Sequence, residues 1–100
     1  MAEIVWTEPA LQELEAIAEY IALDNPVAAR HLISTIFKIT KQLEEFPKSG
    51  RTPPELPNSV YRELVAPPCR IFYREDGKQA LILYVMREER QLRAYMLENS

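Results

Sequence analysis

The residues best suited to chemistry in this chain are arginines, and they gather towards the C-terminus. Residues 60–100 carry seven basic and six acidic side chains, whereas residues 1–59 carry five basic and nine acidic ones, so the halves have charges of +1 and −4 that sum to −3. Six of those seven bases are arginines. Arginine binds carboxylates and phosphates bidentately and stacks on bases. The cluster therefore suits an anionic partner, nucleic acid or acidic protein, although an ordinary solvated surface has a similar composition.

Three of the arginines lie on neighbouring predicted strands. Arg70 and Arg74 are four residues apart, and the period of two in a strand places them on one face. Arg62 lies on the preceding strand. We expect these three guanidinium groups to share one surface of the sheet. A second group follows the last predicted strand and comprises Arg87, Arg90, Arg93 and Tyr95.

Several other chemistries are disfavoured. His31 is the single histidine and Cys69 the single cysteine, whereas a zinc site built from these residue types normally needs four ligands. A histidine-dependent nucleophile would need His31, which lies inside a predicted helix and reads as a surface residue. Gly50 and Gly77 are the only glycines, so a glycine-rich phosphate loop is excluded. We expect no metal and no cofactor.

The chain has the character of a small globular protein. One hundred residues suit one domain, which we expect to span residues 1–100. The longest apolar run, Ala80 to Val85, is far too short to span a bilayer. The first ten residues lack the basic and apolar regions of a signal peptide. We therefore expect a cytoplasmic protein with no membrane contact, and the lone cysteine agrees with that compartment.

The N-terminal half is predicted to be helical. Apolar periodicity predicts helices over residues 8–23 and 26–46, after a short edge strand at Glu3–Thr7. Asn25 can cap the second helix and Pro26 suits its first position. Because the connector is so short, the two helices should form an antiparallel hairpin.

The C-terminal half is predicted to be a sheet. Residues 47–59 hold four of the eight prolines, which predicts a stiff loop. Asp76-Gly77 predicts a type I′ hairpin turn, and residues 87–97 a short helix or turn. The predicted strands are Val60–Ala66, Cys69–Glu75 and Gln79–Met86, the last of them central. The fold class is thus α+β, with an N-terminal strand and an antiparallel helical hairpin packed on a three- to four-stranded antiparallel sheet.

Several local strings accompany this order of elements. They are WTEPALQELEAIAEYIA at 6–22, NPVAAR at 25–30, LEEFPKSGR at 43–51, YRELV at 61–65, CRIFYRE at 69–75 and LILYVMREER at 81–90. The strings and the order of the elements together resemble the ParE/RelE toxin superfamily. The similarity covers nearly the whole chain and is closer to the ParE branch of gyrase-targeting, plasmid-stabilising toxins.

The resemblance implies the toxin of a type II toxin–antitoxin pair, with two candidate activities. ParE-like toxins bind DNA gyrase and block replication, and they have no catalytic residues of their own. RelE-like toxins enter the ribosome and cut mRNA, through attack of a 2′-OH on the adjacent phosphate. That reaction needs a base, an acid and cations that stabilise the transition state. A weak or inactive relative is a third reading.

The residues favour the first activity. If the chain were RelE-like, its catalytic residues would be Arg62, Arg70, Arg87 and Tyr95. However, Glu63 or Leu64 and Glu88 stand where further basic residues are expected, and the net charge of −3 suits an RNA target poorly. We therefore expect a gyrase-binding poison without catalytic residues.

The same resemblance implies the partners. A cognate antitoxin, ParD-like or of another type II class, is expected to fold a flexible tail onto the toxin and to form a hetero-oligomer with it. DNA gyrase is the expected target, and the ribosome with its mRNA is the alternative. The residues expected to contact target or antitoxin are Arg62, Arg70, Tyr73, Arg74, Arg87, Arg90 and Arg93.

Overall fold

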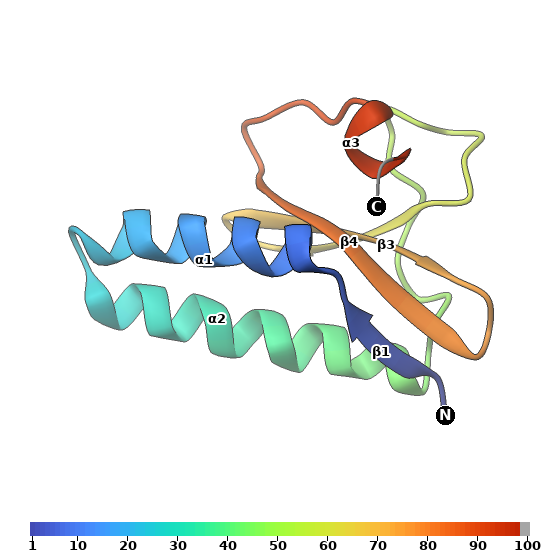
Figure 1. Ribbon diagram of the computed structural model, residues 1–100, viewed down its shortest axis with the longest axis horizontal. Helices are drawn as coiled ribbons and strands as arrows, with labels where there is room; N and C mark the ends of the chain where they lie inside the picture. The colour runs from blue at the N-terminus through green and yellow to red at the C-terminus, as the bar shows by residue number, and fades with distance from the viewer. Residues whose placement is uncertain (99–100) are drawn as a thin grey trace.

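The computed structural model describes residues 1–98 and has the predicted α+β architecture (Figure 1). Two long helices lie side by side along one side of a sheet, and a short C-terminal helix lies on the other side (Figure 1). The elements are β1 (Glu3–Trp6), α1 (Glu8–Ala22), α2 (Pro26–Lys41), the 3₁₀ turn η1 (Gln42–Glu44), β2 (Arg62–Ala66), β3 (Cys69–Glu75), β4 (Gln79–Arg87) and α3 (Tyr95–Glu98).

Both long helices begin at the capping residues that the sequence indicated. The Thr7 side chain accepts a hydrogen bond from the Ala10 backbone N–H, and Asn25 accepts one from Ala28. The predicted extent of the second helix, residues 26–46, was too long, because α2 ends at Lys41 and its last turn tightens into η1 ahead of Pro47. None of the helices within residues 1–98 combines the length and apolar character needed to cross a membrane.

The sheet has the strand order β1-β4-β3-β2, and β4 is central as predicted. Strands β2, β3 and β4 are antiparallel to their neighbours. The predicted antiparallel sheet is confirmed for these three strands, whereas β1 pairs in parallel with β4, from Glu3 opposite Gln79 to Trp6 opposite Ile82. Tight turns force antiparallel pairing of consecutive strands, but the helical hairpin, β2 and β3 lie between β1 and β4 in the chain, so β1 is free of that constraint.

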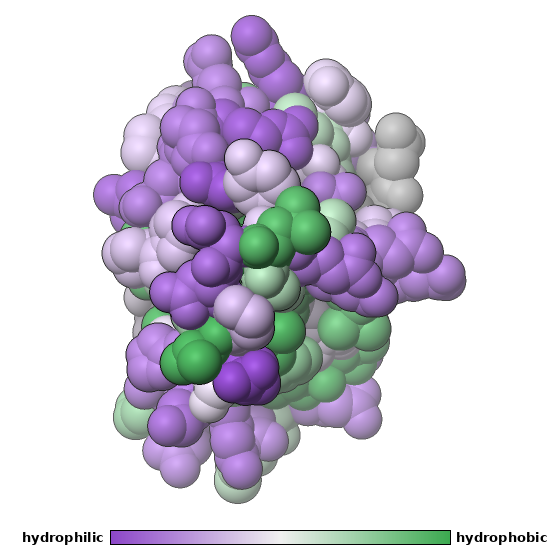
Figure 2. All heavy atoms as spheres, turned by 90° about the vertical axis from the view of Figure 1, so that its left-hand side faces the viewer, coloured by the Kyte–Doolittle hydropathy of each residue, from purple (hydrophilic) through white to green (hydrophobic). Residues whose placement is uncertain are grey.

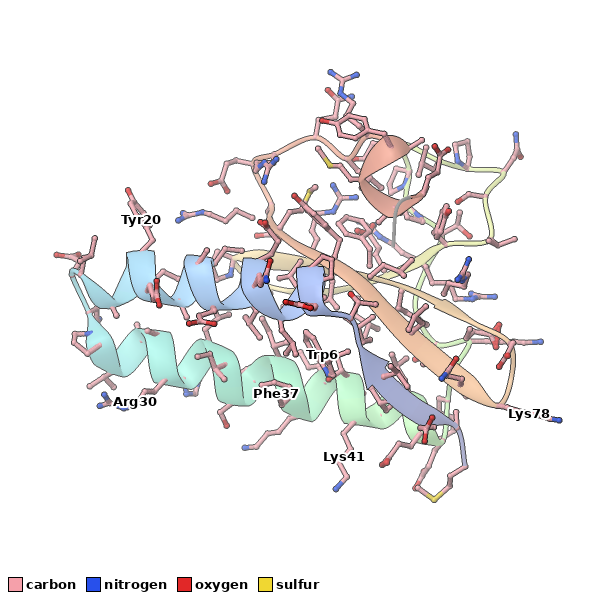
Figure 3. All side chains as sticks on the ribbon, viewed as in Figure 1. Trp6, Tyr20, Arg30, Phe37, Lys41 and Lys78 are labelled. Carbon is pink, nitrogen blue, oxygen red and sulfur yellow. The ribbon has the colours of Figure 1, made fainter. Side chains whose placement is uncertain are left out.

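The two faces of the sheet are covered by different elements. On one face, α1 and α2 pack over the sheet with a core that includes Ile36, Ile71 and Ile82. Trp6 and Phe37 extend this core, with ring centroids 5.0 Å apart (Figure 3). On the other face, a smaller apolar cluster is closed by the proline-rich loop and the C-terminal segment. Its buried members are Phe72, Leu83, Met86, Leu92 and Leu97.

The turn between β3 and β4 differs from the predicted type I′ turn. Among residues 1–98, Gly77 alone has a positive φ, of 87°, whereas a type I′ turn needs positive φ at both central residues. Instead, the Asp76 carboxylate accepts hydrogen bonds from the backbone N–H groups of Lys78 and Gln79, at 2.9 and 2.8 Å. The side chain of Asp76 thus organises a three-residue loop.

A buried tyrosine ties the proline-rich segment to the sheet. The Tyr73 hydroxyl accepts a hydrogen bond from Gly50 N–H and donates one to the Pro47 carbonyl, both 2.8 Å long. A Cβ at position 50 would lie 2.6 Å from the Tyr73 ring and 2.8 Å from the Glu63 carbonyl oxygen. Glycine is therefore needed at this close approach of two chain segments.

We predict that Gly50→Ala lowers the free energy of unfolding by about 3 kcal/mol, from steric overlap and the disrupted Tyr73 hydrogen bond. Gly77→Ala is the matched control, since a Cβ there meets nothing within 4 Å and costs only about 1 kcal/mol for the positive φ. Urea denaturation of the two variants measures the difference. Equal losses would mean that the contact between Gly50 and Tyr73 is not tight in solution.

Candidate functional site

The three arginines expected on one surface are divided between the two faces of the sheet. Arg62 lies opposite Tyr73 in the register of β2 and β3, so its side chain is on the helix-covered face. There its Nη1 atom donates to the carbonyl oxygens of Lys48 and Gly50. Arg70 and Arg74 lie on the other face, as their spacing predicted. The expectation of a shared surface was therefore wrong, because pairing between strands, not alternation within each, sets the face of Arg62 relative to Arg70.

Arg70 is buried in a network of charged side chains. Its Nε atom donates to Glu63 at 2.7 Å. Its two terminal nitrogens, Nη1 and Nη2, each donate to one oxygen of Glu55, also at 2.7 Å. The second oxygen of Glu63 accepts a hydrogen bond from Arg51 Nε at 2.7 Å. Each of the three nitrogens of the Arg70 guanidinium group thus donates to a carboxylate.

The exposure of the four side chains in this network increases from the core towards solvent. The Glu63 side chain is 0% exposed and that of Arg70 10%, whereas the side chains of Glu55 and Arg51 are 21% and 62% exposed. Burial of an arginine and a glutamate is tolerated because each charge has its opposite within hydrogen-bonding distance. The two arginines and two glutamates together carry no net charge.

The ion pairs shift the proton affinities of the network. Hydrogen bonds from Arg70 lower the pKa of Glu55 from 4.5 to about 2. The pKa of Arg70 is raised, first by its hydrogen bonds to Glu55 and also by Glu63. Both groups therefore keep their charges throughout the physiological range. Elsewhere in the sheet, burial raises the pKa of the Cys69 thiol to about 11, which leaves it unreactive at neutral pH.

The four side chains that an RNA-cleaving site would need do not converge. Arg62 lies level with Ile82 in the strand ladder, so it is five residues along the sheet and two strands away from Arg87. Arg70 is on the other face and has its donors engaged by Glu55 and Glu63. Tyr95 is 64% exposed. This arrangement offers no shared point at which one phosphate could meet all four groups.

The remaining predicted site residues are scattered. Arg87 lies above the Tyr20 ring at 5.7 Å, and its Nε is 2.7 Å from a Glu89 oxygen in an ion pair whose geometry is not that of a hydrogen bond. Tyr73 is buried and cannot meet a partner directly. The exposed residues of the set are Arg74, Arg90 and Arg93.

The outer side of the helical hairpin carries a second candidate surface. An open groove of about 520 Å³ runs between α1 and α2. Viewed from the end at which these helices are joined, apolar side chains interrupt a largely polar surface (Figure 2). Tyr20, Leu23 and Val27 are exposed near this end. The apolar residues that line the groove include Leu11, Ala18, Ala22, Ala29, Ile33 and Phe37.

The sequence interpretation missed the partners of Arg70. Glu63 was seen only as a departure from a basic pattern, and Glu55 only as one loop residue. One signal was available for Glu63, since an acidic residue in a strand directly before an arginine-bearing strand is a common cross-strand ion pair. No local signal places Glu55, because its loop lacks a periodic pattern that would fix its position.

Comparison with known proteins gives consistent results. Residues 4–92 match the family model described as ParE toxin of type II toxin-antitoxin system, parDE. The chain is 37% identical to Toxin RelE2 of Caulobacter vibrioides over 79 residues, which cover 77% of this chain and 85% of that toxin. It also resembles a structure described as the chromosomal ParDE TA system from P. aeruginosa, with a TM-score of 0.74 and 27% identity, over 89% of this chain and 98% of that one.

We predict that Glu63→Ala is much more destabilising than Arg51→Ala. Removing Glu63 leaves the Arg70 charge buried with one partner lost, which costs about 3 kcal/mol or more. Removing Arg51, whose side chain is 62% exposed, costs less than about 1 kcal/mol. Thermal and urea unfolding of the two variants provide the comparison. Similar losses would show that Arg70 is not strongly desolvated.

A pH dependence follows from the lowered pKa of Glu55. Because this pKa falls from 4.5 to about 2 on folding, the stabilisation by Glu55 is fully present above pH 4.5 and is lost as the pH falls towards 2. The difference in unfolding free energy between the wild type and Glu55→Gln should therefore shrink across that interval. Glu45→Gln is the control, since Glu45 is exposed and has no ion-pair partner within residues 1–98. A difference independent of pH would contradict the ion pair.

Proposed function

Because this chain belongs to the ParE toxin family of type II toxin–antitoxin systems, we propose that it acts by binding DNA gyrase and that a cognate antitoxin neutralises it. The toxin would stop replication by holding gyrase in an inactive state. It would need a complementary protein surface and no catalytic group of its own.

The observation that carries this proposal is the ion pairing of Arg70. An RNA-cleaving toxin needs free cations beside the scissile phosphate. Here the most buried arginine is neutralised by Glu55 and Glu63. Arg62 is engaged with two backbone carbonyl groups at the far side of the sheet. This arrangement favours a toxin that binds a protein target over a toxin that cleaves RNA.

Charge supports the same choice. The chain carries a net charge of −3, and contact with ribosomal RNA rewards cationic surfaces. Binding to a protein target imposes no such requirement, since an interface with a protein is about as apolar as the rest of a protein surface. Exposed Arg74, Arg90 and Arg93 would then act as single polar contacts within a protein interface.

The groove between α1 and α2 supports binding of an antitoxin. It is lined largely by apolar side chains, and an amphipathic segment of a partner can bury its apolar face in such a groove. Glu15, Glu19 and Arg30 lie on its rim, where they can pair with charges on the partner. A tail that folds on binding would gain a large interface in this way.

Ribosome-dependent mRNA cleavage is the second candidate function. The observation in its favour is the similarity to a relative named RelE2, together with an exposed tyrosine near the C-terminus. On this reading, the cations and Tyr95 would have to be gathered by the ribosome, since Arg62 and Arg70 lie on opposite faces of the sheet in the free protein.

One experiment tests the proposal directly. The protein is induced in a bacterium, and the synthesis of DNA and of protein is followed during the first minutes. We expect DNA synthesis to fall while translation continues, and purified protein to inhibit supercoiling by gyrase in vitro. An early loss of translation with cut mRNA would support cleavage instead, and unchanged growth would indicate an inactive relative.

We further predict that Tyr95→Phe leaves growth inhibition unchanged. The Tyr95 side chain is 64% exposed, so the loss of its hydroxyl should cost no stability, and a gyrase-binding toxin has no proton-transfer step that needs it. Growth curves after induction measure the effect, with the variant and the wild-type toxin compared at equal protein levels. A reduction of about 100-fold, the usual contribution of a general acid or base, would refute the gyrase proposal.

A further inference from the structure

Two neighbouring residues of the proline-rich loop bind the sheet as a ligand would. The Glu55 carboxylate meets the two terminal nitrogens of Arg70 in a bidentate pair. The next residue, Leu56, packs on the apolar cluster around Phe72 and Leu83. Arg70 itself lies over the Phe72 ring, with its guanidinium carbon 4.9 Å from the ring centre. Arg70 thus binds the acidic residue of the loop, and the apolar cluster beside it binds the aliphatic residue that follows in the sequence.

The two carboxylates on Arg70 differ in how firmly they are placed. Glu63 is part of β2, its side chain is 0% exposed, and the ladder with β3 fixes its position. Glu55 belongs to a loop without helix or strand, and its side chain is 21% exposed. Glu63 is therefore a permanent part of the site. Glu55 is the partner that another carboxylate can replace, since only the loop has to move.

The site is open to an incoming chain. A cavity of about 590 Å³ lies beside the ion pair between Arg70 and Glu55. Strand β2 forms the edge of the sheet, and Val65 on that edge is 40% exposed. The residues lining the cavity are Arg51, Pro54, Glu55, Val65, Arg70 and Glu88. Without Glu55, the three remaining members Arg51, Arg70 and Glu63 would carry a net charge of +1 that attracts an acidic group. Glu88, which also lines the cavity, would favour one carboxylate over a strongly anionic ligand.

We propose that the sheet face around Arg70 and Phe72 is a docking site for a short acidic–aliphatic segment of a partner protein, and that Glu55 and Leu56 occupy it within the same chain. The partner's carboxylate takes the place of Glu55 on Arg70, and its aliphatic side chain takes the place of Leu56. The ligand class is thus an acidic residue followed by a leucine-like one, in an extended segment.

Exchange at this site would also affect the C-terminal segment. The Glu55 carboxylate accepts a hydrogen bond from the Leu92 backbone N–H at 3.2 Å, and Leu92 and Leu97 close the same apolar cluster. Withdrawal of Glu55 removes that anchor. Occupation of the site would therefore transfer the acceptor of the Leu92 N–H from the loop to the partner's carboxylate and change the surface presented by residues 88–98. This inference does not depend on gyrase as the target.

A peptide with the sequence of the loop can be used to probe the site. A synthetic peptide with the sequence of residues 52–59, TPPELPNS, is titrated into the full chain and into the double variant Glu55→Ala, Leu56→Ala. Binding is followed by NMR through the Arg70 Nε–H and Leu92 amide signals. The peptide should bind the double variant at least about ten-fold more tightly than the wild type, in which the attached segment competes at an effective concentration on the order of millimolar.

Two controls separate specific docking from charge alone. Glu45→Ala removes the same charge from an exposed site away from Arg70, and it should bind the peptide no better than the wild type. A peptide carrying Glu55→Gln should bind the double variant at least about ten-fold more weakly, because it loses a charge-assisted pair. If the double variant does not fold, the single variant Glu55→Gln replaces it, with a smaller gain expected in the same direction.

Several results would overturn the proposal. One is equal affinity of the peptide for the wild type and for the double variant. Another is equal affinity of the Glu and Gln peptides for the double variant. A third is an NMR shift of the Arg70 Nε–H that inorganic phosphate produces as strongly as the peptide does. A wild-type dimer in size-exclusion chromatography that Glu55→Ala abolishes would assign the site to the loop of a second copy instead. Peptide binding that leaves the Leu92 amide unchanged would also contradict it.

Discussion

The burial of the Arg70 charge is the constraint on which this half of the molecule depends. A guanidinium group inside a small core must be neutralised, because an unpaired charge there would cost several kcal/mol. Glu63 supplies one carboxylate from the neighbouring strand, and Glu55 supplies the other from a loop. To bring Glu55 into place, the proline-rich segment passes around the β2 edge, where Arg51 pairs with Glu63, and it also brings Leu56 to the apolar cluster. The ion pair between Arg70 and Glu55, together with the Tyr73 hydrogen bonds at Pro47 and Gly50, therefore fixes the path of a segment that has no regular structure.

The same constraint explains why both faces of a four-stranded sheet can be covered in so short a chain. The helical hairpin covers one face, and its contacts are ordinary apolar packing. The other face has no long helix. It is closed by the loop and by residues 88–98, which meet at the Glu55 carboxylate. The first layer is held by the larger apolar core, whereas the second combines a smaller apolar cluster with the hydrogen bonds of Glu55. The second layer is therefore the one that a competing ligand can open.

This division bears on function within the ParE toxin family. A cationic cluster that reads as a catalytic or RNA-binding site in sequence becomes, in three dimensions, a neutral structural network on one face and separate arginines elsewhere. Arg51, Arg62 and Arg70 thus serve to hold the fold together, and what remains for a partner is apolar surface with the separate exposed arginines Arg74, Arg90 and Arg93. Such a surface suits our proposal of a toxin that binds a protein target. The two surfaces at which a partner would bind are the groove between α1 and α2 and the sheet face around Arg70 and Phe72.

The sequence alone determined the elements, because their signals are local. The caps at Thr7 and Asn25, the apolar periodicity of the helices and the alternation in β3 each depend on nearby residues, and they were enough for the α+β class and the family resemblance. Tertiary structure alone decided the direction of β1, the face of Arg62 relative to Arg70 and the position of Glu55. The direction of β1 and the position of Glu55 depend on contacts between segments that are separated in the chain, which no local pattern encodes. The face of Arg62 depends on the register of the hairpin formed by β2 and β3, which alternation within each strand leaves open.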